Sequence, residues 1–216
     1  LSSFSLAFFA AIICIIFAII IVYGLRINYK TVSPFARLAS MGYSIPGAVA
    51  AIGILIPVIW LDNLIDFVSV KFFDYSTGLL ISGTWAALLF AYVVRFLALS
   101  IQSVENSFLR ISNSLDYAAK VLGSSGKDII KNIHLKLNIG GICFGILIVF
   151  VDVLKELPAT MILRPYGLST LAIRAHDLAM DERLYDASLP LITIIIVCLL
   201  PLFIVNKVIL SDKRIK

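Results

Sequence analysis

The sequence predicts an all-α, polytopic integral membrane protein, and composition and patterning both indicate it. Of its 216 residues, 61% are hydrophobic and 14% are charged, with a mean hydropathy of +1.03. A soluble domain of this length needs more polar surface to cover it. The apolar residues also gather in runs near the length that spans hydrocarbon as a helix. Helices are expected because open sheet edges leave backbone groups unsatisfied in lipid.

About five transmembrane helices are expected, at about 4–25, 45–61, 79–99, 139–154 and 189–210. The first run lacks a basic segment and a small-residue cleavage site, so it reads as a span rather than a signal peptide. Gly141 and Gly145 in the fourth run have the spacing that lets another helix approach closely. We expect this small-residue face to need a partner outside the chain.

Lys and Arg residues divide unevenly between the two predicted sides of the membrane. One side collects Arg26, Lys30, Arg37, Arg95, Arg110, Lys120, Lys127, Lys131, Lys136, Lys207, Lys213, Arg214 and Lys216. The other side holds fewer basic residues and most of the acids, among them Asp62, Asp66, Asp74 and Glu156. The positive-inside rule makes the first side cytoplasmic, with the N-terminus of this piece outside and its C-terminus inside. Because the basic residues lie in short segments between spans, the net charge of +5 does not indicate nucleic acid.

The polar stretch 101–138 predicts two short amphipathic helices joined at a glycine. Asn113 or Ser114 is expected to cap the first helix, and Gly123 to end it in a left-handed turn. Asp116 stands in its first turn, where the helix dipole favours an acid. An apolar stripe recurs at helical spacing over Leu115, Ala118, Ala119 and Leu122.

The second helix is expected over about 127–137, with one face formed by Ile130, Ile133 and Leu137. A loop of this kind suits docking on a soluble partner, with Ala118 and Ala119 small enough to enter a groove. It equally suits a helix that rests on lipid headgroups. The residues alone leave both interpretations open.

The spacing of this loop resembles the coupling loop of ABC-importer permeases. That family has Glu-Ala-Ala, three residues, Gly, nine residues, Ile, one residue and Leu-Pro. Two positions depart, because Tyr117 stands where the family has Glu and Lys136 where it has Pro, while Asp116 offers an acid one residue earlier. The resemblance implies an ATPase-coupling role for Leu115, Asp116, Tyr117, Ala118, Ala119, Gly123, Ile133 and Leu135.

Two further stretches look like the second half of ferric-iron importer permeases. One is 43–49, which opens the second span, and the other is 155–165, which follows the fourth. In that family two such halves lie in one polypeptide. The resemblance, with Leu1 in place of Met, implies that 1–216 is a single permease domain, the C-terminal half of a longer protein, with 101–138 as its cytoplasmic coupling loop. Relatives for thiamine, polyamines, sulfate or phosphonates share this fold.

The resemblance implies a transport subunit of the bacterial inner membrane and not an enzyme. A periplasmic substrate-binding protein would deliver the cargo, another permease half would complete the path, and a cytoplasmic ATPase dimer would carry the ATP. No cofactor is expected on this chain, which lacks a Gly-rich phosphate loop ending in Lys-Ser or Lys-Thr.

Candidate residues of a translocation path are Asp152, Glu156 and Pro158. A charge within a span is a functional hypothesis by default. Local pairing of Asp152 with Lys155, three residues along one helical face, is the alternative. We expect no stable metal site, because a transporter must release its cargo. Arg95 is expected to extend to headgroup phosphates at the cytoplasmic edge.

The segment 164–188 predicts a short helix near 170–180, as a contact for the binding protein or as a solvated connector. An ion-coupled secondary transporter would have broken helices and buried charges, and buried charge looks sparse here. A membrane enzyme would gather His, Asp, Glu or Ser at one depth, and only Asp152 lies clearly within a predicted span.

Overall fold

The computed structural model describes residues 2–212, without the side chains of 127, 200–202 and 204–212. Within that range the chain is helical and has no strand, which confirms the predicted all-α fold. The elements are α1 (Ser2–Ile27), α2 (Tyr29–Met41), η1 (Gly42–Ser44), α3 (Gly47–Phe73), α4 (Trp85–Phe108), α5 (Asn113–Val121), α6 (Gly126–Ile129), η2 (Ile130–His134), α7 (Leu135–Leu137), α8 (Ile139–Leu154), α9 (Pro158–Leu163), α10 (Leu171–Met180) and α11 (Leu184–Asp212).

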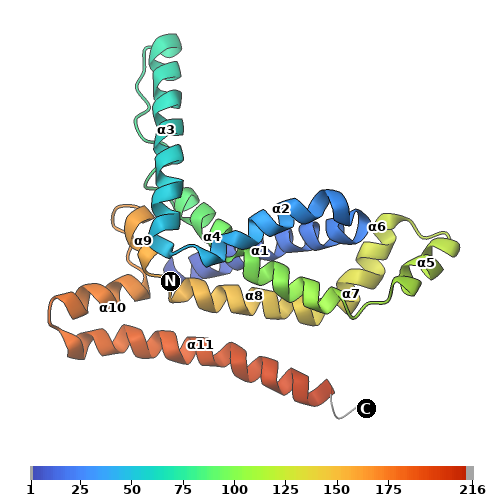
Figure 1. Ribbon diagram of the computed structural model, residues 1–216. Helices are drawn as coiled ribbons and strands as arrows, with labels where there is room; N and C mark the ends of the chain where they lie inside the picture. The colour runs from blue at the N-terminus through green and yellow to red at the C-terminus, as the bar shows by residue number, and fades with distance from the viewer. Residues whose placement is uncertain (1, 213–216) are drawn as a thin grey trace.

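Helices α1, α4 and α8 lie side by side and form the centre of the molecule (Figure 1). Helix α2 folds back along α1. The segment α5–α7 lies at one end of this bundle, and α9 and α10 lie at the other. Alanines on α1 allow the close approach, and the core combines them with large side chains of its neighbours: Leu6, Ala7, Ala10, Ala11, Leu88, Tyr92, Phe96, Val149 and Val153.

Among the described residues, three helices, α1, α3 and α4, are long and apolar enough to cross a membrane. A fourth span results if the segment Ile130–Leu137 and α8, which meet at a 61° bend, count as one. The predicted fifth span falls on α11, whose described apolar part, Leu184–Leu199, is shorter. The rest of that prediction lies outside the described side chains, as do the predicted cytoplasmic tail residues Lys207, Lys213, Arg214 and Lys216.

The third span was predicted too early, at 79–99, whereas α4 covers Trp85–Phe108. Its start is fixed by Thr84, whose side chain accepts a hydrogen bond from the backbone N–H of Ala87 at 3.4 Å. Its last turns stay helical because Ile101, Val104 and Phe108 are buried against α1. The connecting loop therefore begins near 109, and the first part of the polar stretch 101–138 belongs to the bundle.

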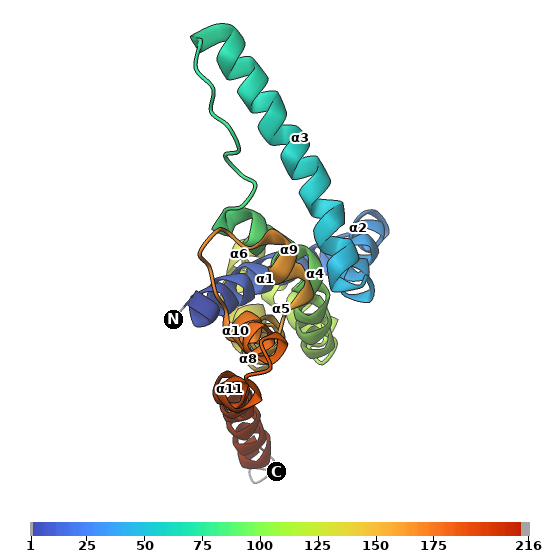
Figure 2. The same cartoon turned by 90° about the vertical axis from the view of Figure 1, so that its left-hand side faces the viewer.

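Helix α3 stands away from the bundle at a steep angle, and the segment 74–84 returns beside it (Figure 2). Two acids of α3, Asp62 and Asp66, hold this segment. The sequence predicted them beyond the end of the second span, but α3 continues to Phe73, so both lie within the helix. Asp62 accepts backbone N–H bonds from residues 80, 81 and 82 at 3.1, 2.8 and 2.7 Å. Asp66 accepts from Thr77 N–H at 2.7 Å and Gly78 N–H at 3.0 Å. Both carboxylates therefore hold the segment 74–84 against α3.

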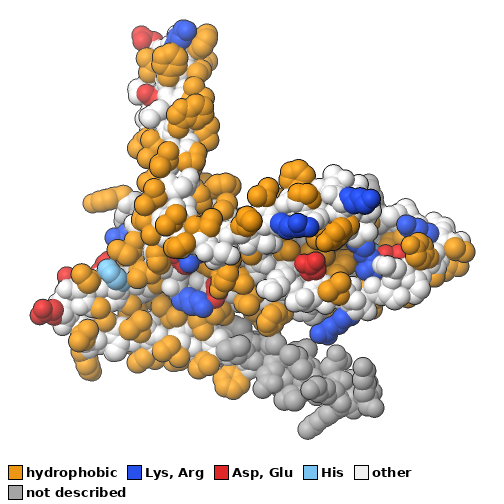
Figure 3. Space-filling model, in the orientation of Figure 1, with side chains coloured by type: hydrophobic (Ala, Val, Ile, Leu, Met, Phe, Trp, Pro, Cys, Tyr) orange, Lys and Arg blue, Asp and Glu red, His pale blue; other side chains and the backbone are white. Residues whose placement is uncertain are grey.

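Hydrophobic side chains cover the visible face of α3 along its length (Figure 3). Its exposed apolar residues include Ile52, Ile56, Trp60, Phe67 and Phe72. Among the described residues, the buried positions of α3 lie between Gly47 and Asp62, where the helix packs on α4, α9 and the returning segment, and the rest of α3 has no buried residue.

The small-residue face of α8 is covered by the chain itself, contrary to the prediction of an outside partner. A Cβ at Gly145 would lie 2.7 Å from Ile15 Cδ1 of α1. A Cβ at Gly141 would lie 2.4 Å from the Cβ of Ser107 on α4, and Ser103 Oγ donates to the Gly141 carbonyl at 2.8 Å. The two glycines therefore permit the packing of α8 against α1 and α4.

We predict that Gly141→Leu lowers the thermal midpoint of the protein in detergent, while Gly140→Leu does not. At Gly141 the side chain meets Ser107, and overpacking of about 3 kcal/mol exceeds the roughly 1 kcal/mol gained in helix propensity. At Gly140 nothing lies within 4 Å of an added Cβ. Equal midpoints for the two variants would contradict this packing.

Candidate functional site

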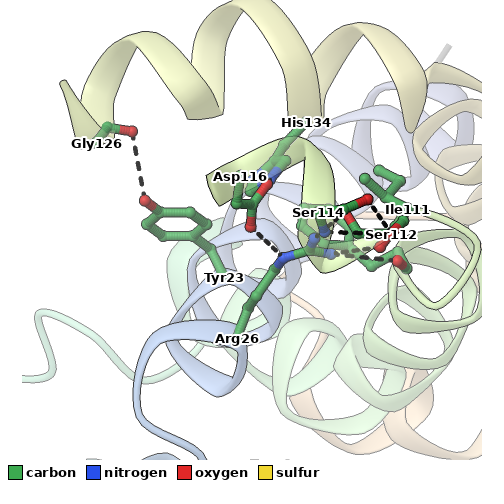
Figure 4. Close-up of polar contacts among 9 residues, drawn as sticks. Tyr23, Arg26, Ile111, Ser112, Ser114, Asp116, Gly126 and His134 are labelled. Atoms are coloured by element: carbon green, nitrogen blue, oxygen red, sulfur yellow. Dashed lines mark hydrogen bonds and ion pairs between the residues drawn. The ribbon is translucent and has the colours of Figure 1, made fainter. Parts of the chain in front are cut away.

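Helix α5 is attached to the end of α1 through one carboxylate, that of Asp116 (Figure 4). Arg26 Nε, in the last turn of α1, donates to Asp116 Oδ2 at 2.8 Å. His134 Nε2 lies 2.8 Å from Asp116 Oδ1, on the other side of the same group. One side chain thus joins three segments that are far apart in the sequence.

Arg26 also ties α1 to the turn between α4 and α5. Its Nη1 donates to the carbonyl of Ile111 at 3.1 Å, and its Nη2 donates to that of Ser112 at 3.3 Å. The guanidinium lies over the ring of Phe108, 5.9 Å from the centroid. These contacts use the planar fork of arginine, which a lysine could not reproduce.

His134 is 1% exposed and lies between two aromatic rings. The ring centroids of Tyr23 and Phe108 are 5.7 and 5.2 Å from that of the imidazole. The Tyr23 hydroxyl donates to the carbonyl of Gly126 at 3.4 Å, so α1 also holds the start of α6. The imidazole is therefore fixed in place by packing as well as by Asp116.

The electrostatics of this cluster keep Asp116 ionised. Burial raises the pKa of Asp116, but the hydrogen bonds and charges of His134 and Arg26 outweigh it and hold the pKa below its ordinary value of 3.8. Because an ionised carboxylate only accepts, His134 Nε2–H is the donor. The contribution of Asp116 to stability is thus present above its ordinary pKa and is lost as the pH falls through the lower, folded value.

The predicted first helix of the loop is confirmed as α5, with a different start. Ser112 caps it, since its Oγ accepts from Ser114 N–H at 3.2 Å, rather than Asn113 or Ser114. The left-handed end at Gly123 is confirmed, with φ at +81°. Gly123 N–H donates to Lys120 O, and the next N–H donates to Ala119 O, both at 3.0 Å, as in a Schellman motif.

The predicted second helix spans 126–137, but its buried face is not the expected one. Ile129 and His134 are buried, whereas Ile130 and Ile133 are half-buried and Leu137 is exposed. The cause is the π-helical turn η2, whose wider winding brings residues five apart onto one side. A 3.6-residue period could not predict this face. Leu135, expected in the coupling site, is half-buried here.

The outward side of α5 is apolar and has no cover among the described residues. Tyr117, Val121 and Leu122 are 66%, 87% and 85% exposed. The predicted stripe is therefore split, since Ala119 is buried while Leu115, Ala118 and Leu122 are exposed. Asp116 points into the chain and so supplies no acid on the outward side, where the family resemblance placed one at Tyr117.

The predicted path residues lie where α8 ends and α9 begins, away from α5. Asp152 forms the ion pair with Lys155 that was the alternative to a role in the path, with Lys155 Nζ 2.6 Å from Asp152 Oδ1. The Tyr43 hydroxyl donates to Asp152 Oδ2 at 3.2 Å. Pro158 begins α9. Glu156 binds Arg95, whose Nη1 lies 2.5 Å from Oε1.

Arg95 was predicted wrongly to reach headgroups at the membrane edge. It lies well inside α4 and is 17% exposed on its side chain. Buried charge is therefore less sparse than the sequence indicated. Among the residues that the structure describes, no group of three His, Cys, Asp or Glu side chains could hold a metal ion.

Sequence reasoning missed Arg26, His134 and Arg95 as site residues. Each pairs with an acid on a different segment, and nothing local specifies that partner. One signal was available: Arg95 interrupts an apolar run, where a charge requires a partner.

A similarity in sequence to a known protein accompanies this geometry. The chain is similar to the Fe(3+)-transport system permease protein FbpB 2 of Haemophilus influenzae, with 21% identity over 159 residues. The match covers 69% of this chain and 31% of the relative, so the chain spans about a third of that protein's length. The chain matches no protein-family model. The likeness supports a transport permease in general, in agreement with the apolar helices.

We predict that Asp116→Asn loosens α5. Loss of the charge weakens both hydrogen bonds, each worth about 1.5–3 kcal/mol when charge-assisted. Local opening should then increase, and amide hydrogen exchange in 113–121 should rise by roughly 10- to 100-fold. Lys120→Gln, on the exposed side of the same helix, should leave exchange unchanged. Equal exchange in both variants would show that the cluster does not hold α5.

Proposed function

We propose that this chain is a permease subunit of an ATP-driven, binding-protein-dependent importer. The observation that carries the proposal is the geometry of α5. Its inner side is fixed to α1 by Asp116, and its outer side presents Tyr117, Val121 and Leu122 without cover. A helix held in this way can receive a push from a soluble partner and pass it to the membrane helices. A helix resting on lipid would need no such rigid attachment.

The proposed partner on this outer side is a cytoplasmic ATPase dimer, which carries the ATP. The coupling residues are Leu115, Asp116, Tyr117, Ala118, Ala119, Gly123, Ile133 and Leu135. Tyr117 and Leu115 serve as direct contacts, while Asp116 and Gly123 set the position and the end of α5. Tyr117 in place of the family's Glu makes this contact more apolar than in the resembling permeases.

The proposed orientation places the α5 end of the bundle in the cytoplasm. Basic side chains lie over α2 and the segment α5–α7 on the visible face (Figure 3), as the positive-inside rule requires. Helix α1 begins at the opposite end, and α11 runs back toward the α5 end (Figure 1). This arrangement supports an inner-membrane protein with the N-terminus of this piece outside and its C-terminus inside.

A second permease half is the proposed cover for α3. Its apolar surface is too long and continuous to stay uncovered in a working path. At the other end of the bundle, α10 confirms the helix expected near 170–180 and is the proposed contact for the periplasmic binding protein.

Ferric iron is the proposed cargo, supported by the similarity to the Fe(3+)-transport system permease protein of Haemophilus influenzae. Thiamine, polyamines, sulfate and phosphonates remain cargoes of the same importer class. The proposed path includes Glu156 and Pro158, and Asp152 through its contact with Tyr43.

We predict that Val121→Asp combined with Leu122→Asp abolishes ATP-dependent uptake of radioactive ferric iron. Vesicles would contain the full-length protein, its ATPase and its binding protein. Two charges on the exposed apolar side would have to be desolvated on docking, which disfavours the complex. The control, Asn113→Asp, places a charge in the first turn of α5, where the helix dipole favours it, and should keep uptake near that of the unmodified protein.

The same vesicles separate the importer class from its cargo. Stimulation of ATP hydrolysis by the binding protein without iron uptake would keep the importer and assign another cargo. Transport that is indifferent to ATP would contradict the proposal and favour an ion-coupled secondary transporter.

A further inference from the structure

Two breaks in the helical chain meet beside the middle of α4. The first is Gly42–Pro46, where η1 turns the chain from α2 into α3. The second is the turn 155–157, where α8 ends and α9 begins at Pro158. In membrane transporters, interrupted helices at one depth commonly form the place where cargo passes.

Two glycines bring the first break into contact with α4. A Cβ at Gly42 would lie 2.0 Å from the carbonyl oxygen of Val94, so only glycine lets η1 press against that backbone. A Cβ at Gly47 would lie 1.8 Å from Arg95 Nη1 and 2.9 Å from Glu156 Oε1. The start of α3 therefore seats directly on the ion pair of these two residues.

Glu156 joins the second break to the same point. Its Oε1 accepts from Arg95 Nη1 at 2.5 Å and from the backbone N–H of Ala159, in the first turn of α9, at 3.0 Å. The side chain is 6% exposed. One carboxylate thus holds the start of α9 against α4, while the start of α3 packs on the same atoms.

Arg95 of this pair lies near the middle of α4, a helix long and apolar enough to cross a membrane. Arg95 stands 13 residues before Phe108, the end of α4, which is about 20 Å at 1.5 Å per residue. Arg95 Nε is buried and has no hydrogen-bond partner among the described residues. Burying a guanidinium with an unused hydrogen-bond donor costs free energy of desolvation. A contact that served only to hold the fold together would not need this charge, because apolar residues of similar volume pack as well.

We propose that the Arg95–Glu156 ion pair is the closed gate of the transport pathway, holding the breaks before α3 and α9 together until cargo passes. The inference rests on the proposed transport function and deepens it. Opening exchanges the Arg95–Glu156 contact for separate contacts of each charge with water or cargo. The missing side chain of Gly47 leaves the room that the pair occupies in this closed state.

The test is passive entry of cobalt(II) into vesicles that contain the full importer and calcein but no ATP, read as quenching of the trapped dye. Glu156→Gln removes the charge with little change in shape and should raise cobalt entry at least tenfold over the unmodified protein. Asp186→Asn, the matched control, removes a carboxylate that also pairs with a base nearby, Arg183, but lies outside the proposed path, and it should leave entry unchanged. Arg95→Glu combined with Glu156→Arg restores opposite charges and should bring entry back toward the original rate.

Protein level and thermal midpoint are measured alongside, to separate a gate from a structural tie. A lowered midpoint with cobalt entry at the original rate would overturn the proposal, as would equal leak in Glu156→Gln and Asp186→Asn. If Glu156→Gln does not accumulate, Arg95→Lys keeps the charge but loses the fork geometry and should give the same leak. Since no ATP is used, a failure of the importer proposal would appear separately, as absent ATP-driven uptake in the unmodified protein.

Discussion

Asp116 accepts one hydrogen bond from the end of the first membrane helix and one from the segment that leads into the fourth. Besides this carboxylate, the buried Ala119 and the contacts of Arg26 with carbonyl groups hold α5, while Tyr23 holds the start of α6. The cluster is partly buried, so its charges are screened less than surface pairs are. Its consequence is mechanical: a force applied to the exposed side of α5 reaches α1 and α8 together.

A second polar centre lies where Arg95 of α4 and Glu156, after α8, meet the chain breaks before α3 and α9. The two centres share α4, which ends at the first and carries the second. An ATP-driven importer needs this kind of connection, since ATP acts at one end of the bundle and cargo crosses within it. In the proposed mechanism, α1, α4 and α8 move as a rigid body, and α3 and α9 move at the breaks that precede them.

The sequence was sufficient for the class of fold and for most of the spans, because hydrocarbon demands long apolar helices. It placed the ends of α4 wrongly, since Thr84, Asp62 and packing against α1 set them. The turn at Gly123 was predictable because its chemistry is local. The buried face of 126–137 was not, because a π-helical turn shifts the register. The ion pairs of Arg26 and Arg95 join residues 90 and 61 positions apart, which no local pattern specifies.

The rigid attachment of α5 to α1 is the central claim, and double electron–electron resonance between spin labels at Lys120→Cys on α5 and Ile20→Cys on α1 tests it most directly. The labels would be placed in the full importer with Cys14, Cys143 and Cys198 replaced, and the distance measured with and without ATP. We predict an unchanged distance, because the contacts of Asp116 make the end of α1 move together with α5. A distance that changes on ATP binding would show that α5 moves independently of α1, and would contradict the rigid attachment.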